Sequence, residues 1–433
     1  MNVVNKKKKK DLRSFAVIAV LSFFIIIGIV LLNTNFSFVG KKSIHEEAKT
    51  YKTRHCLAFY PDSKQGLSFV KDLCREEKND TIYDYTLVPY GDYYLVNYGN
   101  DRKYFADQNF DPVEIKEVSE EGKKIIVDYL RYTFKKEKPE QYYNADFVSK
   151  LTYDNIDFSN VTYSIASESI VADIPQYDIS VSIPLKYMQK QIGMDFGFPN
   201  EIYSKPVYID PDPAHPIVCL TFDDGPQFNF ISGECSSERI VDLLYQYDAS
   251  ATFYVIGDML TNREVWADYQ VYTLLKRSIN QGNEYGSHTQ THGSALTDLN
   301  TSEEMRKEIM GPVEYLNDFM GYEMKTFRPV EGSFNDKVLE STELPAILWD
   351  VDSEDWLTRD PQQICDQVLK YEYESGDIVL LHDIYDESAE ALEKILPELV
   401  NRGCQLVSVS DMLRFYNIDP SLIDYFYSPG YYE

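Results

Sequence analysis

The sequence predicts an α/β fold over residues 215–415, a smaller α+β domain before it, and a single N-terminal transmembrane helix. Beyond residue 215, apolar runs alternate with helical stretches, a pattern typical of a parallel sheet that is either open or closed into a barrel. Between residues 54 and 202, short tyrosine-rich runs are separated by turn sequences. Near the N-terminus, one long run is almost wholly apolar.

That apolar run covers residues 15–32, and Ser22 is its only polar member. At about 1.5 Å per residue, a helix of this length nearly spans a hydrocarbon core of about 30 Å. A secretory signal is the alternative, but its apolar region is shorter and a cleavage site follows it. We therefore expect an uncleaved, single-pass anchor in the cell membrane, with the basic residues 1–14 in the cytoplasm. Residues 33–53 then form a stalk, and the remainder of the chain is extracellular.

The net charge of the chain is -28, which argues against a nucleic-acid partner because a polyanion would be repelled. The six cysteines permit disulfides outside the cell without requiring them. Cys56 and Cys74 are the expected local pair, whereas Cys219 lies in an apolar run and is expected to be a buried free thiol.

Residues 54–202 are expected to form an extracellular α+β domain of unknown role. Turn sequences at 89–92 and 99–101 predict hairpins, and residues 120–136 predict a helix. The tyrosines could form a carbohydrate platform, but strand tyrosines more often serve packing, so we expect a spacer or regulatory role. Four prolines within 203–216 mark the domain boundary.

Beyond this boundary, strands and helices alternate. The candidate strands are residues 216–222, 250–257, 283–289, 325–330, 346–352, 377–383 and 405–410. The helical stretches between them include residues 237–247, 302–320 and 361–373. Thr301 before Glu304, and Asp360 before Pro361, are typical helix starts. In such architectures, functional residues gather at the carboxyl ends of the strands.

Asp223 and Asp224 follow the first of these strands, and Gly225 and Pro226 then turn the chain. Adjacent strand residues point to opposite faces, so a turn is needed to bring both carboxylates to one site. Alone, such a pair is more often a turn or a helix cap than a functional site. A functional interpretation therefore requires partners elsewhere in the chain.

His288 and His292 are the first such partners, in the sequence HTQTH at the end of another strand. With an aspartate, two imidazoles at this spacing can bind a metal and leave one position open for water. On an exposed helix the same spacing is often two solvated histidines, but Gly286 and Gly293 favour a loop at the strand end.

Four further polar residues follow strands: Arg328, Asp352, Asp355 and His382. Each alone would more often be a surface ion pair or a buried structural histidine. Because all of them follow apolar strand runs in one domain, we expect them to share a site with the aspartates and histidines described above.

The segments TFDDGP, HTQTH, FRP, WDVDSEDW and LLHD, in this order, resemble the five motifs of the polysaccharide deacetylases of carbohydrate esterase family 4, or NodB homology domain. The resemblance covers residues 215–415. It implies a distorted (β/α) barrel and a divalent metal, usually zinc, that serves to hydrolyse an N-acetyl group of an acetylated sugar.

Carried onto matching positions, the resemblance implies that Asp224, His288 and His292 bind the metal and that Asp223 is the general base. A cation beside Asp224 would relieve the repulsion between the two carboxylates. Arg328, which the family places against the base, would hold Asp223 ionised.

The resemblance also implies that His382 is the general acid and that Asp355, rather than Asp352, orients it. Where the family typically has a tyrosine after Arg-Pro-Pro, this chain has Glu331, preceded by Val330. The backbone N–H of Glu331 can still bind the oxyanion, while its carboxylate adds a charge near the sugar.

A second departure is the long loop at residues 227–237, which contains Cys235 and either shapes the substrate groove or covers the rim of the barrel. The expected substrate is N-acetylglucosamine in a cell-wall polysaccharide, with peptidoglycan first. N-acetylmuramic acid, an exopolysaccharide, a chitin-like oligomer and acetylated xylan remain alternatives, as does a non-catalytic wall-binding protein on the same fold. Residues 416–433 form a tail for which the sequence indicates no role.

Overall fold

The computed structural model describes most of the chain after residue 47. The described residues are 2–5, 48–52, 56–61, 64–76, 83–98, 102–166, 168–198, 203–227, 235–261 and 265–427. They fall into two compact units. The small unit comprises Lys7–Lys123 and Phe158–Glu201, and the barrel unit comprises Met1–Lys6, Lys124–Asp157 and Ile202–Glu433.

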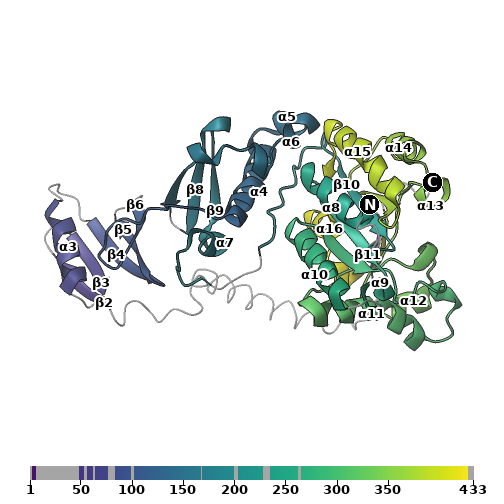
Figure 1. Cartoon of the computed structure of the whole chain (residues 1–433). Coiled ribbons are helices and arrows are strands. Elements are labelled where there is room, and N and C mark those ends of the chain that lie inside the picture. Colours follow the sequence, from purple (N-terminus) through teal and green to yellow (C-terminus); the bar gives the residue numbers. More distant parts are fainter. Residues whose placement is uncertain are drawn as a thin grey trace. The chain divides into compact units, whose positions relative to one another are not determined.

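The small unit contains two sheets (Figure 1). The first has strand order β2-β3-β4-β5-β6 and one helix, α3 (Lys64–Glu76). Its strands are β2 (Ala48–Lys52), β3 (Cys56–Pro61), β4 (Tyr83–Tyr90), β5 (Tyr93–Tyr98) and β6 (Arg102–Ala106). Strands β4 and β5 are antiparallel and joined at residues 91–92, which confirms the hairpin predicted there.

The second sheet is an antiparallel meander followed by the short helix α7 (Leu185–Met188). Its strands are β7 (Thr162–Ala166), β8 (Ser169–Ile174) and β9 (Ile179–Pro184). Burial alternates along β8 and β9, so that one face packs into a core while the other carries exposed serines.

Residues 124–157 belong to the barrel unit, although the sequence groups them with the 54–202 domain. This segment holds most of helix α4 (Glu120–Glu137), then α5 (Pro139–Tyr142) and α6 (Ala145–Val148). Arg131 in α4 is fully buried and donates a 2.7 Å hydrogen bond to the carbonyl of Tyr245. An amphipathic pattern shows that a helix face is buried but not which partner buries it, so the sequence could not reveal this assignment.

The barrel unit is built on parallel strands in the order β12-β11-β10-β15-β14. They are β10 (Ile217–Asp223), β11 (Ala251–Val255), β12 (Glu284–Ser287), β14 (Val351–Asp352) and β15 (Asp377–His382), and β16 (Gln405–Leu406) pairs with the start of β10. Phe327 bridges Ser287 to Ala346 in β13 (Ala346–Ile347), which leads directly into β14. The pairings therefore return to their start and close an irregular barrel.

The strand predicted over residues 325–330 is reduced to the single bridge at Phe327. Pro329 has no N–H to donate, and the chain then turns through a short 3-10 helix at Val330–Gly332. This interruption is the main irregularity of the barrel.

Helices pack around the strands (Figure 1). The longer ones are α8 (Ser236–Gln246), α10 (Val265–Asn280), α11 (Ser302–Met320), α14 (Pro361–Leu369) and α15 (Asp386–Asn401). Both predicted start signals are confirmed: Thr301 and Glu304 form a reciprocal capping box on α11, and Asp360 caps α14 before Pro361.

Strand β17 (Ile423–Tyr427) lies within the predicted tail and pairs in parallel with β13. Its other neighbour is β1 (Asn2–Asn5), which runs antiparallel to it. The cytoplasmic location predicted for residues 1–14 stays a prediction. The predicted anchor at 15–32 lies outside the described residues, and within those residues no helix is both long and apolar enough to cross a membrane.

Four cysteines with described side chains are free thiols: Cys219, Cys235, Cys365 and Cys404. Cys219 is buried in β10, as the sequence predicts. The side chains of the predicted pair, Cys56 and Cys74, lie outside the described ones.

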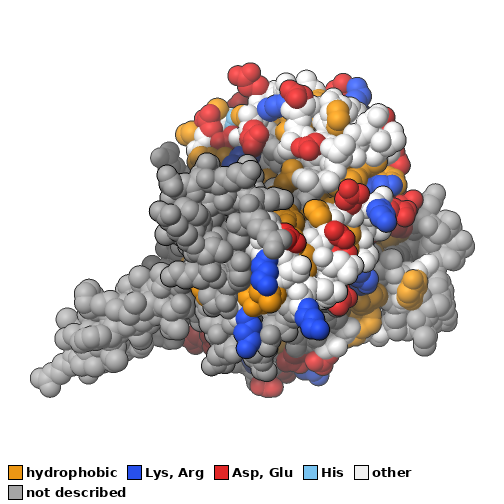
Figure 2. All heavy atoms as spheres, turned by 90° about the vertical axis from the view of Figure 1, so that its left-hand side faces the viewer, with side chains coloured by type: hydrophobic (Ala, Val, Ile, Leu, Met, Phe, Trp, Pro, Cys, Tyr) orange, Lys and Arg blue, Asp and Glu red, His pale blue; other side chains and the backbone are white. Residues whose placement is uncertain are grey.

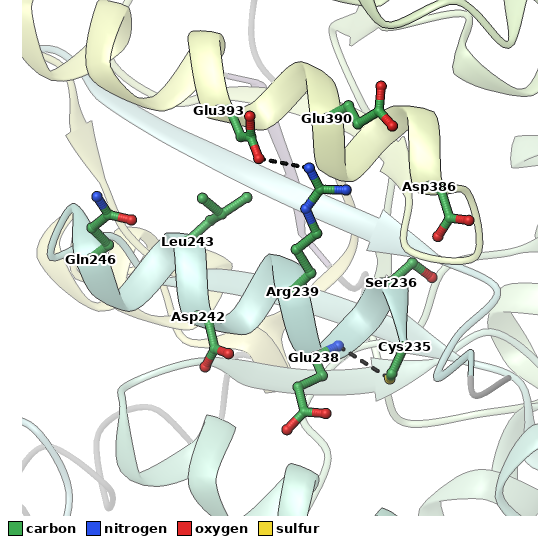
Figure 3. Close-up of a pocket in the computed structure, with 10 residues that line it drawn as sticks. All are labelled: Cys235, Ser236, Glu238, Arg239, Asp242, Leu243, Gln246, Asp386, Glu390 and Glu393. Atoms are coloured by element: carbon green, nitrogen blue, oxygen red, sulfur yellow. Dashed lines mark hydrogen bonds and ion pairs between the residues drawn. The ribbon is translucent and has the colours of Figure 1, made fainter. Parts of the chain in front are cut away.

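Charged side chains of both signs are interspersed on the face shown in Figure 2. Acidic groups gather in a groove of about 570 Å³ between α8 and α15, where Arg239 donates a 2.6 Å hydrogen bond to Glu393 across the groove (Figure 3). The lining of this groove includes Asp242, Asp386 and Glu390 but none of the predicted site residues. The acidic groove is therefore distinct from the candidate site described next.

Candidate functional site

Asp223 and Asp224 lie at the carboxyl end of β10. Asp223 is the last strand residue, lies opposite His382 of β15, and is only 3% exposed. Asp224 adopts a left-handed φ of 76°, and the following Gly225–Pro226 peptide is cis. Because the backbone turns at Asp224, the two carboxylates do not point to opposite faces as they would in a continuing strand. The turn that the sequence requires is present.

The carboxylate of Asp224 faces two imidazoles. Its Oδ1 lies 3.4 Å from Nε2 of His288 and 3.4 Å from Nε2 of His292. The candidate ligand atoms of these three residues all lie within 4.8 Å of one another. Oδ1 is buried and has no hydrogen-bond partner among the described residues, a costly arrangement that a cation would relieve. The donor set therefore fits a divalent metal, with two nitrogens and one carboxylate oxygen.

The second ring nitrogen of His288, Nδ1, orients the imidazole for metal binding. Its Nδ1–H donates a 2.8 Å hydrogen bond to the carbonyl of Arg328, which leaves the Nε2 lone pair directed at Asp224. Burial lowers the pKa of His288, despite the nearby carboxylates, and so favours the neutral imidazole that a metal binds.

His292 is carried by a loop rather than a helix, as the sequence predicts. Thr289 and His292 have left-handed φ angles of 71° and 52°. The Thr289 hydroxyl accepts a 3.2 Å hydrogen bond from the His292 N–H. Glu308 of α11 accepts from the N–H groups of Gln290 and Thr291 at 3.1 and 2.9 Å, and so anchors the loop.

Arg328 supports Asp223 from the interior of the barrel. Its fully buried guanidinium donates to Asp223 Oδ1 at 2.9 Å and to Thr221 Oγ1 at 2.7 Å. It also donates to the carbonyls of Ile347 and Leu348 at 3.0 and 3.1 Å. Arg328 thus gives the Asp223 carboxylate a buried cationic partner and a charge-assisted hydrogen bond.

His382 is paired with Asp355. Its Nδ1 lies 2.7 Å from Asp355 Oδ1, and Asp355 is fully buried. Burial disfavours the charged imidazole, but the hydrogen bond and the charge of Asp355 outweigh it and raise the pKa of His382 to about 9. Asp352 instead accepts from the N–H of Glu354 at 2.8 Å. The structure thus brings Asp355, and not Asp352, to the histidine.

Of the two departures from the family motifs, the structure describes Glu331 and only the ends of the loop at residues 227–237. Glu331 lies in the turn after Arg328, with a left-handed φ of 54° and an exposed side chain. Of the long loop at 227–237, residues 228–234 lie outside the described residues. The Cys235 thiol at the end of this loop accepts from the N–H of Glu238 and so caps α8.

Several residues that support the site were not predicted from the sequence. Ser388 donates a 2.6 Å hydrogen bond to Asp355 Oδ2. Asp383 is buried behind Gly225, accepts a 2.6 Å hydrogen bond from Ser237, and has its pKa raised by burial to about 7. Asp383 could have been predicted from the sequence because it directly follows His382. Ser388 and Ser237 lie in helices, where a serine does not indicate a functional role.

Comparison with known proteins supports the family. Residues 210–345 match the family model described as polysaccharide deacetylase. The peptidoglycan-N-acetylmuramic acid deacetylase PdaC of Bacillus subtilis is 34% identical over 213 residues, which are 49% of this chain and 42% of that protein. A peptidoglycan-N-acetylglucosamine deacetylase of Bacillus cereus is 33% identical over 207 residues, 46% of this chain and 89% of that protein.

The peptidoglycan-N-acetylglucosamine deacetylase PgdA of Listeria monocytogenes is 32% identical over 195 residues, 45% of this chain and 38% of that protein. The chain thus spans about two fifths of the length of PdaC and PgdA. It covers most of the shorter Bacillus cereus protein at a comparable identity. The expected resemblance is confirmed, and the chain belongs to the polysaccharide deacetylase family.

Proposed function

We propose that this protein is a metal-dependent deacetylase that hydrolyses the N-acetyl groups of N-acetylglucosamine units in peptidoglycan. The observation that carries the proposal is the position of the buried, unpartnered Asp224 Oδ1, 3.4 Å from each histidine Nε2 and next in sequence to the Asp223–Arg328 pair. This arrangement joins a candidate metal site to a carboxylate that is paired with a buried guanidinium, a combination suited to metal-assisted hydrolysis.

The proposed metal is zinc, held by Asp224, His288 and His292. Two imidazoles and one carboxylate suit zinc and leave a coordination position open. When bound, the metal would supply Lewis acidity to the water and to the acetamide carbonyl.

The residues of the chain would carry the protons. Asp223, which is paired with Arg328, removes a proton from the attacking water, whose oxygen forms a bond to the acetamide carbon. The backbone N–H of Glu331 donates to the oxyanion of the tetrahedral intermediate. His382, kept protonated by Asp355, gives its proton to the nitrogen as the C–N bond breaks, which releases acetate and a free amine.

The names of the relatives support peptidoglycan as the substrate. PgdA and the Bacillus cereus protein are named for N-acetylglucosamine, and PdaC is named for N-acetylmuramic acid. N-acetylmuramic acid is therefore the second candidate substrate.

Acetate release from purified peptidoglycan tests the proposal. The protein should release acetate, a chelator should abolish the release, and added zinc should restore it. Asp223→Asn should lower kcat by about 10²-fold or more, while the matched surface variant Asp318→Asn on α11 should retain activity. Unchanged rates with Asp223→Asn or with chelator would contradict the mechanism.

Parallel assays on other polymers address the substrate. Mass spectrometry of muramidase digests distinguishes glucosamine from muramic acid products. Activity on chitin oligomers or xylan, but not on peptidoglycan, would mean that the substrate is a different acetylated polymer. The proposed deacetylation chemistry would still stand. No acetate from any polymer, together with retained binding to cell walls, would favour a non-catalytic wall-binding protein.

The cellular location is a separate proposal that rests on the apolar residues 15–32. We place the residues that follow this segment outside the cell, tethered by it, with residues 1–14 in the cytoplasm. Cell fractionation and protease accessibility in intact cells test the arrangement. Recovery of the full-length protein in the cytosol would contradict it.

A further inference from the structure

The segment that joins the two candidate metal-binding histidines, residues 288–292, is held by two helices, and we call it the histidine loop. One helix is the short α9 (Gly257–Thr261), which contacts the other, α11 (Figure 1). The N–H of Gly257 donates to the carbonyl of Thr289 at 3.0 Å, and the N–H of Asp258 donates to the carbonyl of Gln290 at 2.8 Å. The first N–H groups of a helix have no partner within it, so the loop satisfies two of them.

Helix α11 holds the same region through more than the carboxylate of Glu308. Ser287, at the end of β12, donates a 2.6 Å hydrogen bond from its hydroxyl to the carbonyl of Ile309. A Cβ atom at Gly311 would lie 2.3 Å from Oε1 of Gln290, so only a glycine leaves room for this side chain. Glycine within a helix is destabilising, and the close approach of Gln290 gives Gly311 a physical reason.

The side chain of Gln290 occupies the gap between α9 and α11. A Cβ atom at Gly257 would lie 2.2 Å from its Oε1, just as one at Gly311 would. Its Nε2 group donates a 2.8 Å hydrogen bond to Oδ1 of Asp258. Gln290 is therefore held by its side chain as well as by its backbone, at the middle position of the histidine loop.

The position of His292 depends on this loop more than that of His288 does. The Nδ1 atom of His288 is hydrogen-bonded to a carbonyl, whereas Nδ1 of His292 has no hydrogen-bond partner among the described residues. The side chain of His292 is 35% exposed, and its φ angle is left-handed, as is that of Thr289. Such angles are costly for residues other than glycine and persist only where the surroundings fix them.

We propose that Gln290 is a positioning residue for the metal site: its side chain, bonded to Asp258 between two glycines, holds the histidine loop so that Nε2 of His292 stays directed at Asp224. The inference rests on the proposed function, because the metal belongs to that proposal. Gln290 acts on the metal through His292. Contacts that orient a metal ligand commonly change metal affinity by about 10- to 100-fold.

Calorimetric zinc titration of Gln290→Glu tests the proposal. This substitution keeps the size of the side chain but places a carboxylate against Oδ1 of Asp258, so the contact becomes repulsive. An added negative charge near a cation would by itself strengthen zinc binding, so weaker binding would indicate a displaced loop. We expect the Kd for zinc to rise by about tenfold or more. Gln290→Ala should also raise it, and serves alone if Gln290→Glu does not fold.

A second substitution should restore binding. In Gln290→Glu/Asp258→Asn the hydrogen bond is re-formed with donor and acceptor exchanged, and the net charge equals that of the unaltered protein. The Kd for zinc should return to near its original value. Cobalt(II) bound in place of zinc has a visible absorption spectrum that depends on the ligand arrangement. Gln290→Glu should alter this spectrum and the double variant should restore it, while Gln363→Ala, an exposed glutamine of α14, should leave both readouts unchanged.

The outcomes separate this inference from the proposed function. An unchanged zinc Kd and cobalt spectrum in both Gln290 variants would overturn the inference, even if the metal-free proteins were less stable, because Gln290 would then serve only packing. A raised Kd that the double variant does not restore would also overturn it, since the contact with Asp258 would not be what holds the loop. An unaltered protein that binds neither zinc nor cobalt would instead refute the metal site and the proposed function with it.

Discussion

The Nδ1 atom of His382 lies 2.7 Å from Oδ1 of the fully buried Asp355. The other oxygen of this carboxylate accepts hydrogen bonds from the His382 backbone N–H at 2.8 Å and from the Ser388 hydroxyl at 2.6 Å. Together with a 2.8 Å hydrogen bond from the Trp356 N–H to Oδ1, these contacts hold Asp355 so that it fixes the imidazole and directs its Nε2 away from the carboxylate. In the proposed mechanism, this nitrogen carries the proton given to the leaving amine.

Asp355→Asn should lower kcat and move the alkaline limb of the pH profile to lower pH. The imidazole must be protonated to act as an acid, and Asp355 raises its pKa to about 9, above the ordinary value. Removing the carboxylate lowers that pKa, so protonation is lost at a lower pH. We expect a loss in kcat of about 10²-fold, within the range for general acids.

The matched control for this prediction is Asp352→Asn. Asp352 lies in the same segment but contacts the Glu354 N–H rather than the histidine. Its substitution should leave the alkaline limb in place. A pH series of kcat decides the matter, and identical shifts for both variants would show that Asp355 acts only through local structure.

Arg328→Met should destabilise the protein by about 3–5 kcal/mol, because it leaves the buried Asp223 carboxylate without its cation. In Arg328→Met/Asp223→Asn, the uncompensated charge is absent, so the loss should be smaller than the sum of the two single losses. Urea unfolding of all four proteins measures this coupling. Simple additivity would mean that the ion pair does not link the two residues.

The sequence predicted the elements of the barrel better than the geometry of its site. Helix α11 spans the predicted residues 302–320, because Thr301 begins it with a capping box and Gly321 ends it with a left-handed φ of 70°. Apolar runs likewise marked β10 and β15, since strands buried on both faces need no alternation. These are local signals that a linear pattern can carry.

The site depends on backbone turns and distant partners that no linear pattern contains. The left-handed φ angles at Asp224 and His292 turn both side chains to one point, and neither residue requires such an angle by its chemistry. Glu308, which holds the histidine loop, lies in a helix where a glutamate is unremarkable. Strand β17 was missed because its tyrosines resemble those elsewhere in the chain.

Asp224→Asn should abolish metal binding without destabilising the metal-free protein. The substitution removes one of two adjacent negative charges and an unpartnered buried oxygen. Its amide can donate to the Nε2 atoms of the two histidines, so the metal-free stability should equal or exceed that of the unaltered protein.

Calorimetric zinc titration and thermal unfolding check this prediction. For the unaltered protein, zinc at about 100 times its Kd should add about 2.7 kcal/mol of stability. Asp224→Asn should show no such gain, while Asp318→Asn should retain it. A metal-free Asp224→Asn protein that unfolds well below the parent would show that the aspartate has a structural role of its own.

Lys205→Met should destabilise the barrel unit by about 3–5 kcal/mol at pH 7, because Lys205 Nζ lies 2.6 Å from Asp248 Oδ1 and both groups are buried. Burial raises the pKa of Asp248, but Lys205 and Arg131 outweigh it and lower the pKa overall. A lowered folded-state pKa contributes stability above the ordinary aspartate pKa, and that contribution is lost as pH falls through the folded value.

The difference between the unaltered protein and Lys205→Met should therefore shrink as the pH is lowered, since a protonated Asp248 no longer needs a cation. Urea unfolding at pH 7 and at about pH 4 measures the difference, near the range where aspartates titrate. Lys276→Met is the matched control, because Lys276 is exposed on α10 and should cost less than about 0.5 kcal/mol. A difference that does not change with pH would mean that Lys205 stabilises the barrel unit by packing rather than by pairing with Asp248.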